Sequence, residues 1–241
     1  LFIDPTLIFS TYSGSTADNF GYSATYDSHG NAFSAGSVFG VGYPLVVGHY
    51  IMSYVGGSII HFTGGGQYPG DDISITKYTA DGTKRIFSTY LGGSGQDLPH
   101  SFIVNSNDEL YVVGTTYCQD YPTKPNAYDT TFNGGNDPGV WDGIAAHYKR
   151  GSDIVITHFS VDGSQLLSST YVGGSDNDGL NYRAGQPYAS PGFLRHNYAD
   201  EVRGDIEIDK NNNIYIASCT RSADFPRTTG SFQSNFGGGM D

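Results

Sequence analysis

Paired carboxylates, arginines and a histidine lie together in one segment of the chain, residues 176–201. It contains Asp176-Asn-Asp-Gly-Leu-Asn-Tyr-Arg183 and Arg195-His196-Asn-Tyr-Ala-Asp200-Glu201. Two carboxyl groups a few ångströms apart can act on a glycosidic bond as general acid and as nucleophile or base. Acidic residues in loops are more often simply solvated, and catalysis needs a specific geometry, so no catalytic residue is assigned. The candidate ligand-binding residues of this segment are Arg183, Arg195 and His196.

A second segment, residues 133–150, contains the only tryptophan of the chain. An exposed indole can cover the apolar C–H face of a sugar while neighbouring polar groups meet its hydroxyls. The competing interpretation buries the ring between two structural units, because large aromatic side chains are usually buried. The candidate ligand-binding residues here are Trp141, Asp142, His147 and Tyr148.

Oxygen-bearing side chains alternate in three short phrases that resemble the first half of a calcium loop. The glycine at the sixth position and the downstream bidentate glutamate of such a loop are missing. Asp and Asn also favour tight turns, because they tolerate left-handed backbone and bond their own main chain. A hairpin turn is therefore the favoured interpretation, and Ca²⁺ is the one cofactor that stays open. The candidate metal ligands are Asp209, Asn211 and Asn213; the related phrases are Asn105-x-Asn107-x-Glu109 and Asp27-x-His29-x-Asn31.

The elements that position these segments are repeated along the chain. A Ser-Thr-Tyr phrase followed by a glycine turn recurs at Tyr12, Tyr90 and Tyr171, which are 78 and 81 residues apart. An aromatic-proline pair recurs downstream at 43–44, 121–122 and 225–226. One repeat is a supersecondary unit that buries its apolar face only against its neighbours.

Each repeat alternates apolar and polar residues in short runs and predicts four antiparallel strands. Asp-Gly at 81–82 and at 162–163 supplies the backbone that a tight hairpin turn requires. In the first repeat the expected strands cover 22–27, 32–36, 73–79 and 84–91.

Four antiparallel strands per repeat are the content of a propeller blade, so the fold class predicted is all-β, a partial β-propeller with long loop insertions. The expected parts are an outer strand of a preceding blade in 1–14, with its strand over 2–12, blade I in 20–93, blade II in 100–174 and an incomplete blade III in 201–241. Closed propellers have about four to eight blades. The missing blades are expected from the rest of a longer chain or from other subunits.

The charge and hydropathy of the chain limit the classes of partner that it is expected to bind. The chain has 12 basic and 24 acidic residues, a formal net charge of −12, which argues against nucleic acid as a partner. No apolar run approaches the length of a membrane span, so no membrane insertion is expected. Cys118 and Cys219 are four positions out of register in their repeats, and we expect two free thiols.

The repeated phrases resemble the bacterial β-propeller repeat (SBBP) family, most closely in residues 88–97 and 209–239. The second stretch includes Ser222-Ala-Asp-Phe-Pro226 and Gly230-Ser-Phe-Gln233. The resemblance covers about two thirds of the chain and is interrupted by the insertions. It implies a protein secreted by, or held on the surface of, a Gram-negative bacterium, in some members through type IX secretion. The family has no shared catalytic residues to carry over.

The function expected from these features is a non-enzymatic extracellular scaffold or adhesion module. It would recognise a glycan or a surface protein through the insertion loops, where function usually resides on a rigid scaffold. One alternative is an enzyme that acts on polysaccharide, a glycoside hydrolase or lyase, with carboxylates from the loops. A second alternative is a structural subunit of a filament or other surface assembly.

Overall fold

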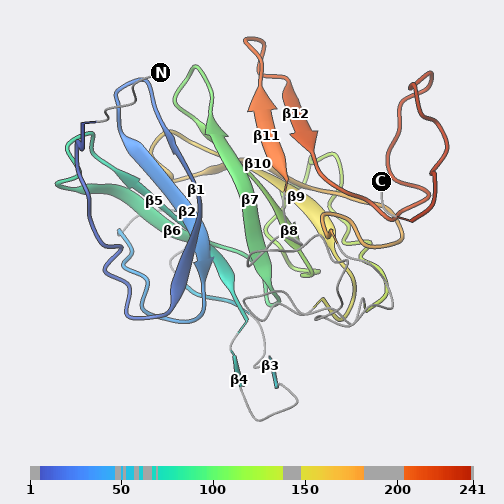
Figure 1. Cartoon of the computed structure of the whole chain (residues 1–241), viewed down its shortest axis with the longest axis horizontal. Coiled ribbons are helices and arrows are strands. Elements are labelled where there is room, and N and C mark those ends of the chain that lie inside the picture. Colours follow the sequence, from blue (N-terminus) through green and yellow to red (C-terminus); the bar gives the residue numbers. More distant parts are fainter. Residues whose placement is uncertain are drawn as a thin grey trace.

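The structure is a computed structural model (Figure 1). It describes residues 6–46, 50, 53–56, 60–61, 67–68, 70–137, 148–181 and 204–239. Within these ranges all regular structure is β-strand, so the predicted all-β class is confirmed. The described residues contain no helix that is long and apolar enough to cross a membrane.

Two four-stranded antiparallel sheets follow each other along the chain, and neighbouring strands in sequence are neighbours in each sheet. The predicted strands of the first repeat correspond to the first sheet, with ends that differ by at most three residues. The first sheet contains β1 (Asn19–Tyr26), β2 (Ala32–Val38), β5 (Asp72–Tyr78) and β6 (Arg85–Leu91); the second contains β7 (Asp97–Val104), β8 (Leu110–Thr116), β9 (Asp153–Phe159) and β10 (Leu166–Val172).

Two smaller antiparallel pairs complete the described strands. β11 (Asp205–Ile208) pairs with β12 (Ile214–Ala217) and begins a third sheet. The short pair β3 (Ile60–His61) and β4 (Gln67–Tyr68) lies in the connection between β2 and β5 and projects beyond the first sheet (Figure 1).

The predicted Asp-Gly turns form as expected. Gly82 between β5 and β6 has φ of 68°, and Gly163 between β9 and β10 has φ of 69°. Glycine adopts this left-handed backbone without a steric penalty. The turns that join β7 to β8 and β11 to β12 use Asp108 and Asn212 in the same region, with φ of 63° and 62°.

The sheets pack face to face, and β8 of the second sheet is buried on both sides. Leu110 and Val112 of β8 face the first sheet, where they join a core with Phe33, Ile75 and Phe87. The alternate residues of β8, Tyr111 and Val113, pack instead on the isoleucines of β11 and β12. Side chains alternate along a strand, so β8 is covered on both faces and all seven of its residues are buried.

Consecutive repeats also meet through one recurring contact. Phe9 lies against Gly82, and Phe87 of β6 lies against Gly163 in the same way. The two phenylalanines are 78 residues apart in sequence, and the two glycines are 81 residues apart. The strand predicted over 2–12 is not formed in its described part: residues 6–12 contain no strand. A β-strand needs a hydrogen-bonding neighbour, and none of the described strands pairs with this segment.

Candidate functional site

The long connections between strands all leave from one end of the sheets. Residues 39–71, 117–152 and 173–204 join strands at this loop-bearing end, which lies at the bottom of Figure 1. At the opposite end the connections are turns of five or six residues, such as 27–31 and 160–165. Because functional residues concentrate in loops on a rigid scaffold, the loop-bearing end is the candidate functional site.

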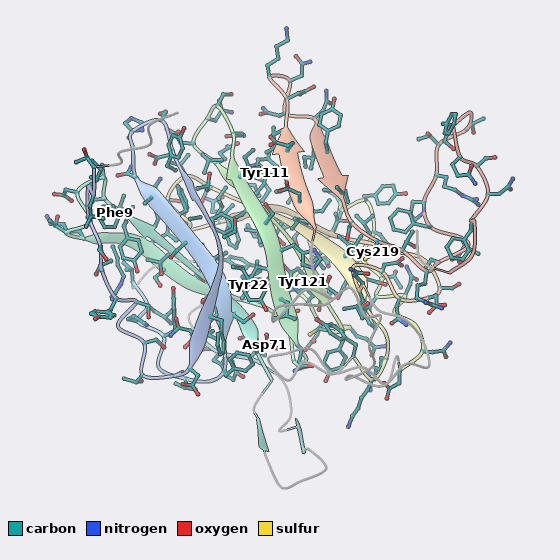
Figure 2. All side chains as sticks on the ribbon, viewed as in Figure 1. Phe9, Tyr22, Asp71, Tyr111, Tyr121 and Cys219 are labelled. Atoms are coloured by element: carbon teal, nitrogen blue, oxygen red, sulfur yellow. The ribbon has the colours of Figure 1, made fainter. Side chains whose placement is uncertain are left out.

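The aromatic-proline phrase attaches the first two long connections to their own sheets. The backbone N–H of Tyr121 donates to the hydroxyl of Tyr171 over 3.1 Å, and that hydroxyl donates to the carbonyl of Cys118 over 2.7 Å. In the first sheet Tyr43 and Tyr90 make the equivalent 3.1 Å bond. Figure 2 places Tyr121 near the loop-bearing end. Buried polar groups require such partners, so the phrase fixes where each loop starts.

Two buried aspartates hold the glycine turns at this end. Asp97 accepts a 2.8 Å hydrogen bond from the N–H of Gly93, and Asp178 accepts a 2.7 Å bond from that of Gly174. Both side chains are fully buried. Burial raises the pKa of Asp97 to about 6, although hydrogen bonds, among them that from Gly93, oppose the rise.

A second aspartate stands beside each of these, at the start of the third strand of the sheet. Asp153 accepts bonds of 2.7 and 3.0 Å from the N–H groups of Asn133 and Gly134, and Asp72 accepts one of 2.8 Å from Val55. Burial raises the pKa of both Asp72 and Asp153 to about 7. These four carboxyl groups are out of contact with solvent and mainly bind backbone amides, so their role is to hold loops.

At the opposite end, one group of side chains has the composition of a metal site. Single ligand atoms of Asp27, His29 and Asp108 lie within 4.8 Å of one another. Lys77 already places its ammonium 2.8 Å from Asp27, and Ser28 donates two hydrogen bonds to Asp108. The sequence pointed to two of these residues as a turn, but Asp108 and Lys77 could not be associated with them without the fold.

The predicted metal phrase at 209–213 forms a hairpin turn. One oxygen of Asp209 accepts from the N–H groups of Asn211 and Asn213, at 2.8 and 2.9 Å, and the other accepts from the Asn213 amide at 2.8 Å. Hydrogen bonds, first that from the Asn213 side chain, lower the pKa of Asp209. Both oxygens are thus already engaged in holding the turn, and Ca²⁺ binding here stays a prediction.

Most of the predicted ligand-binding residues lie outside the residues that the structure describes. Tyr148 is buried and packs with Leu98 and Leu180, which places its ring in the core at the loop-bearing end. The structure brings it together with none of the other candidates, since they lie outside the described residues: Trp141, Asp142, His147, Arg183, Arg195 and His196.

A pocket of about 370 Å³ opens at the loop-bearing end of β11 and β12. The sequence did not bring its lining residues together, because they come from either side of an insertion of more than twenty residues. Its lining residues are Asn181, Gly204, Asp205, Ala217, Ser218 and Cys219.

Both cysteines are free, as predicted. Cys118 is buried, and its thiol lies 3.2 Å from the Asp97 carboxylate. Burial raises the pKa of the Cys118 thiol, and it raises that of Cys219 to about 11. In the third repeat Ser222 occupies the place of Cys118 and donates to Asp178 over 2.9 Å. This position therefore requires only a neutral group that donates a hydrogen bond to the aspartate, either a thiol or a hydroxyl.

Comparison with known proteins identifies no relative: no protein-family model matches the sequence, and no curated protein matches it significantly.

Proposed function

We propose that the two sheets and the β11–β12 pair are consecutive blades of a β-propeller of the SBBP type. The support is that each complete sheet is a four-stranded meander and that the first strands β1, β7 and β11 are neighbours in that order. The recurring contacts of Phe9 with Gly82 and of Phe87 with Gly163 support a constant docking of one repeat on the next. Blades arranged radially around an axis have these properties.

On this scaffold the chain would serve as a non-enzymatic extracellular binding module that recognises a glycan or a surface protein through its insertions. The observation that carries the proposal is the gathering of all long connections at one end, opposite an end made of short turns. A secreted or surface location on a Gram-negative bacterium fits the acidic composition, with a formal charge of −12.

A polysaccharide-acting enzyme is the weaker candidate. Such an enzyme needs two carboxyl groups that reach the scissile bond. The described carboxyl pairs at the loop-bearing end, Asp72 with Asp97 and Asp153 with Asp178, are buried and bind backbone amides. Their arrangement supports a role in holding the loops.

The third sheet has only two described strands and an edge at which another strand can pair. β12 is the last described strand of a two-stranded sheet, and its Ile214 and Tyr215 are 39% and 57% exposed. An uncovered edge of this kind is a template for pairing with another strand. We propose that it pairs with a continuation of the same chain or with another subunit, as a propeller ring or a surface assembly requires.

A glycan array and a pull-down from bacterial surface extracts, with the purified protein, test the binding function. Trp141→Ala is expected to weaken binding at least tenfold, because losing a central aromatic contact in an interface typically costs about 2 kcal/mol or more. Tyr26→Ala is the control, since this tyrosine is 74% exposed at the short-turn end. Equal losses in both variants, or binding to neither glycan nor protein, would refute the proposal.

A further inference from the structure

The third repeat departs from the first two at one point of its first strand. In β1 and β7 the pairing with the next strand shifts by one residue, a β-bulge whose extra residue is Tyr22 in β1 and His100 in β7. A bulge leaves one residue outside the ladder and redirects its side chain. Both complete sheets therefore carry a single bulged residue at the same place.

In the third repeat a long insertion occupies that place. Asp178 pairs with Thr220, and the N–H of Gly179 donates to the carbonyl of Cys219 over 2.8 Å, so the first strand begins as in the second sheet. The next pair is Asp205 with Ala217. Residues 180–204 thus stand where the second sheet has only Pro99 and the bulged His100, so an insertion separates the described parts of this strand.

The strand that pairs with the first strand also differs between the repeats, at the residue opposite this position. A Cβ added at Gly36 would lie 1.8 Å from the carbonyl oxygen of Phe20, and one added at Gly114 would lie 2.4 Å from that of Leu98. Glycine is required at both positions because the bulged strand passes so closely. The equivalent third-repeat residue is Ser218, which lines the pocket.

The pocket lies between the two described parts of this strand. Its 370 Å³ are lined by residues from the two resumed ends of the strand, Asn181 and Asp205, and by Ser218 and Cys219 of the facing strand and its continuation. Figure 2 labels Cys219 beside the end of β12. The volume is near the lower end of the range of small-molecule sites, which suits one ring-sized group.

The polar groups around the pocket favour a ligand that donates hydrogen bonds. Asp205 uses one carboxylate oxygen for Ser101, at 2.8 Å, and for its own neighbour's N–H, at 2.9 Å. The other oxygen remains for a ligand. Ser218 and Asn181 add a hydroxyl and an amide, which both donate and accept. No lysine or arginine occurs among the described lining residues, so an anionic ligand would lack a counter-charge there.

A buried acceptor stands behind the pocket wall. The Thr115 hydroxyl donates to the carbonyl of Gly179 over 3.0 Å, so in its 2.7 Å contact with His100 it accepts from Nε2–H. Nδ1 of His100 then carries a lone pair, and it has no partner among the described residues. A Cβ placed on Gly204, a lining residue, would be 2.6 Å from it. Burial lowers the pKa of His100 to about 3, which keeps the ring neutral.

We propose that this pocket binds one neutral sugar ring of a glycan, held by hydrogen bonds from its hydroxyls to Asp205, Asn181 and Ser218. The proposal rests on glycan recognition as the function of the loop-bearing end and gives it a specific site.

Alkylation of Cys219 by a maleimide reports occupancy of the pocket, and buried Cys118 is the internal reference, followed by peptide mass spectrometry. The probes are glucose, galactose, mannose and N-acetylglucosamine, with glucuronic acid as the anionic comparison. A sugar at ten times its Kd should slow alkylation about tenfold, because about one tenth of the pocket stays free. Ser218→Leu should abolish the protection, and Tyr215→Leu on the same strand should retain it.

The outcomes separate the pocket from the general function. Glycan-array binding that survives Ser218→Leu, with no protection of Cys219 by any neutral sugar, overturns the pocket and leaves the binding function standing. Equal or better protection by glucuronic acid overturns its preference for neutral sugars. A silent array without any protection overturns both. Protection by a neutral sugar that Ser218→Leu removes supports the pocket even if the pull-down finds no protein partner.

Discussion

Removal of the buried ammonium of Lys77 should destabilise the fold strongly, because it leaves a buried carboxylate without its counter-charge. Lys77 on β5 lies 2.8 Å from Asp27, and the two side chains are 3% and 1% exposed. The ammonium also donates to the carbonyl of Val161 in the second sheet, over 3.2 Å, and lies 4.8 Å from the ring centre of Phe33. One side chain therefore joins two hairpin turns of neighbouring sheets.

The size of the effect follows from the charge that is left behind. Breaking a buried ion pair by removing one partner costs about 3–5 kcal/mol. Lys77→Met should fall near the lower end of that range, about 3 kcal/mol, because Asp27 keeps three hydrogen bonds, one from His29 and two from Asn31. For a chain of this length each kcal/mol lowers the Tm by about 2–4 °C. The expected decrease is therefore about 6–12 °C.

Thermal and urea unfolding followed by circular dichroism measure this effect. Glu109→Gln is the matched control, since Glu109 and His158 form the equivalent pair of the second sheet, with side chains 24% and 14% exposed. Pairs in contact with solvent contribute about 1 kcal/mol or less. Asp27→Asn added to Lys77→Met should restore part of the lost stability, because the penalty comes from the unpaired carboxylate. The reasoning fails if the double variant is less stable than Lys77→Met, or if Lys77→Met and Glu109→Gln cost the same.

Three further outcomes are expected. Gly114→Ala should lower the urea midpoint by the equivalent of about 1–3 kcal/mol, because its Cβ would lie 2.4 Å from the Leu98 carbonyl oxygen. Ser218→Ala, at the equivalent position of the third repeat, should leave the midpoint unchanged. Equal effects of the two substitutions would contradict the difference between the repeats. Burial raises the pKa of Asp153 to about 7 from 3.8, so its stabilising protonation is present below about pH 4 and is lost as the pH rises through 7. Urea midpoints should fall over this window, and Asp153→Asn should flatten the decrease; a slope that it leaves unchanged would assign the pH dependence to other groups. Asp209→Ala should lower the Tm equally in EDTA and in excess calcium, because its oxygens hold the turn; a loss confined to calcium would instead support a metal there.

The local features of the fold could be predicted from the sequence because they depend on neighbours in the chain. The Asp-Gly turns at Gly82 and Gly163 and the four strands of the two complete repeats follow from turn chemistry and alternation. The expected strand over 2–12 did not form in its described part, because strands depend on a partner that local pattern cannot supply.

The candidate site was less predictable because its residues are distant in sequence. Asn181 and Asp205 meet only because an insertion interrupts a strand at its bulge, and no periodicity marks that position. Likewise, Asp108 joins the 27–31 turn from the second sheet, and Lys77 joins it from β5 of the first sheet. The buried aspartates at the glycine turns do carry a sequence signal, since Asp97 and Asp178 follow their Gly-Gly pairs at the same spacing.

The attachment of two long connections by an aromatic-proline phrase has a consequence for how such a chain can change over evolutionary time. Tyr121 and Tyr171 fix the start of one connection on its own sheet, and Asp153, at its end, binds its middle part at Asn133. Residues between these two anchors can be added or exchanged without disturbing the strands. New recognition surfaces can therefore arise at one end of the molecule by insertion alone, while the stacking of the repeats, which has little tolerance for error, stays as it is.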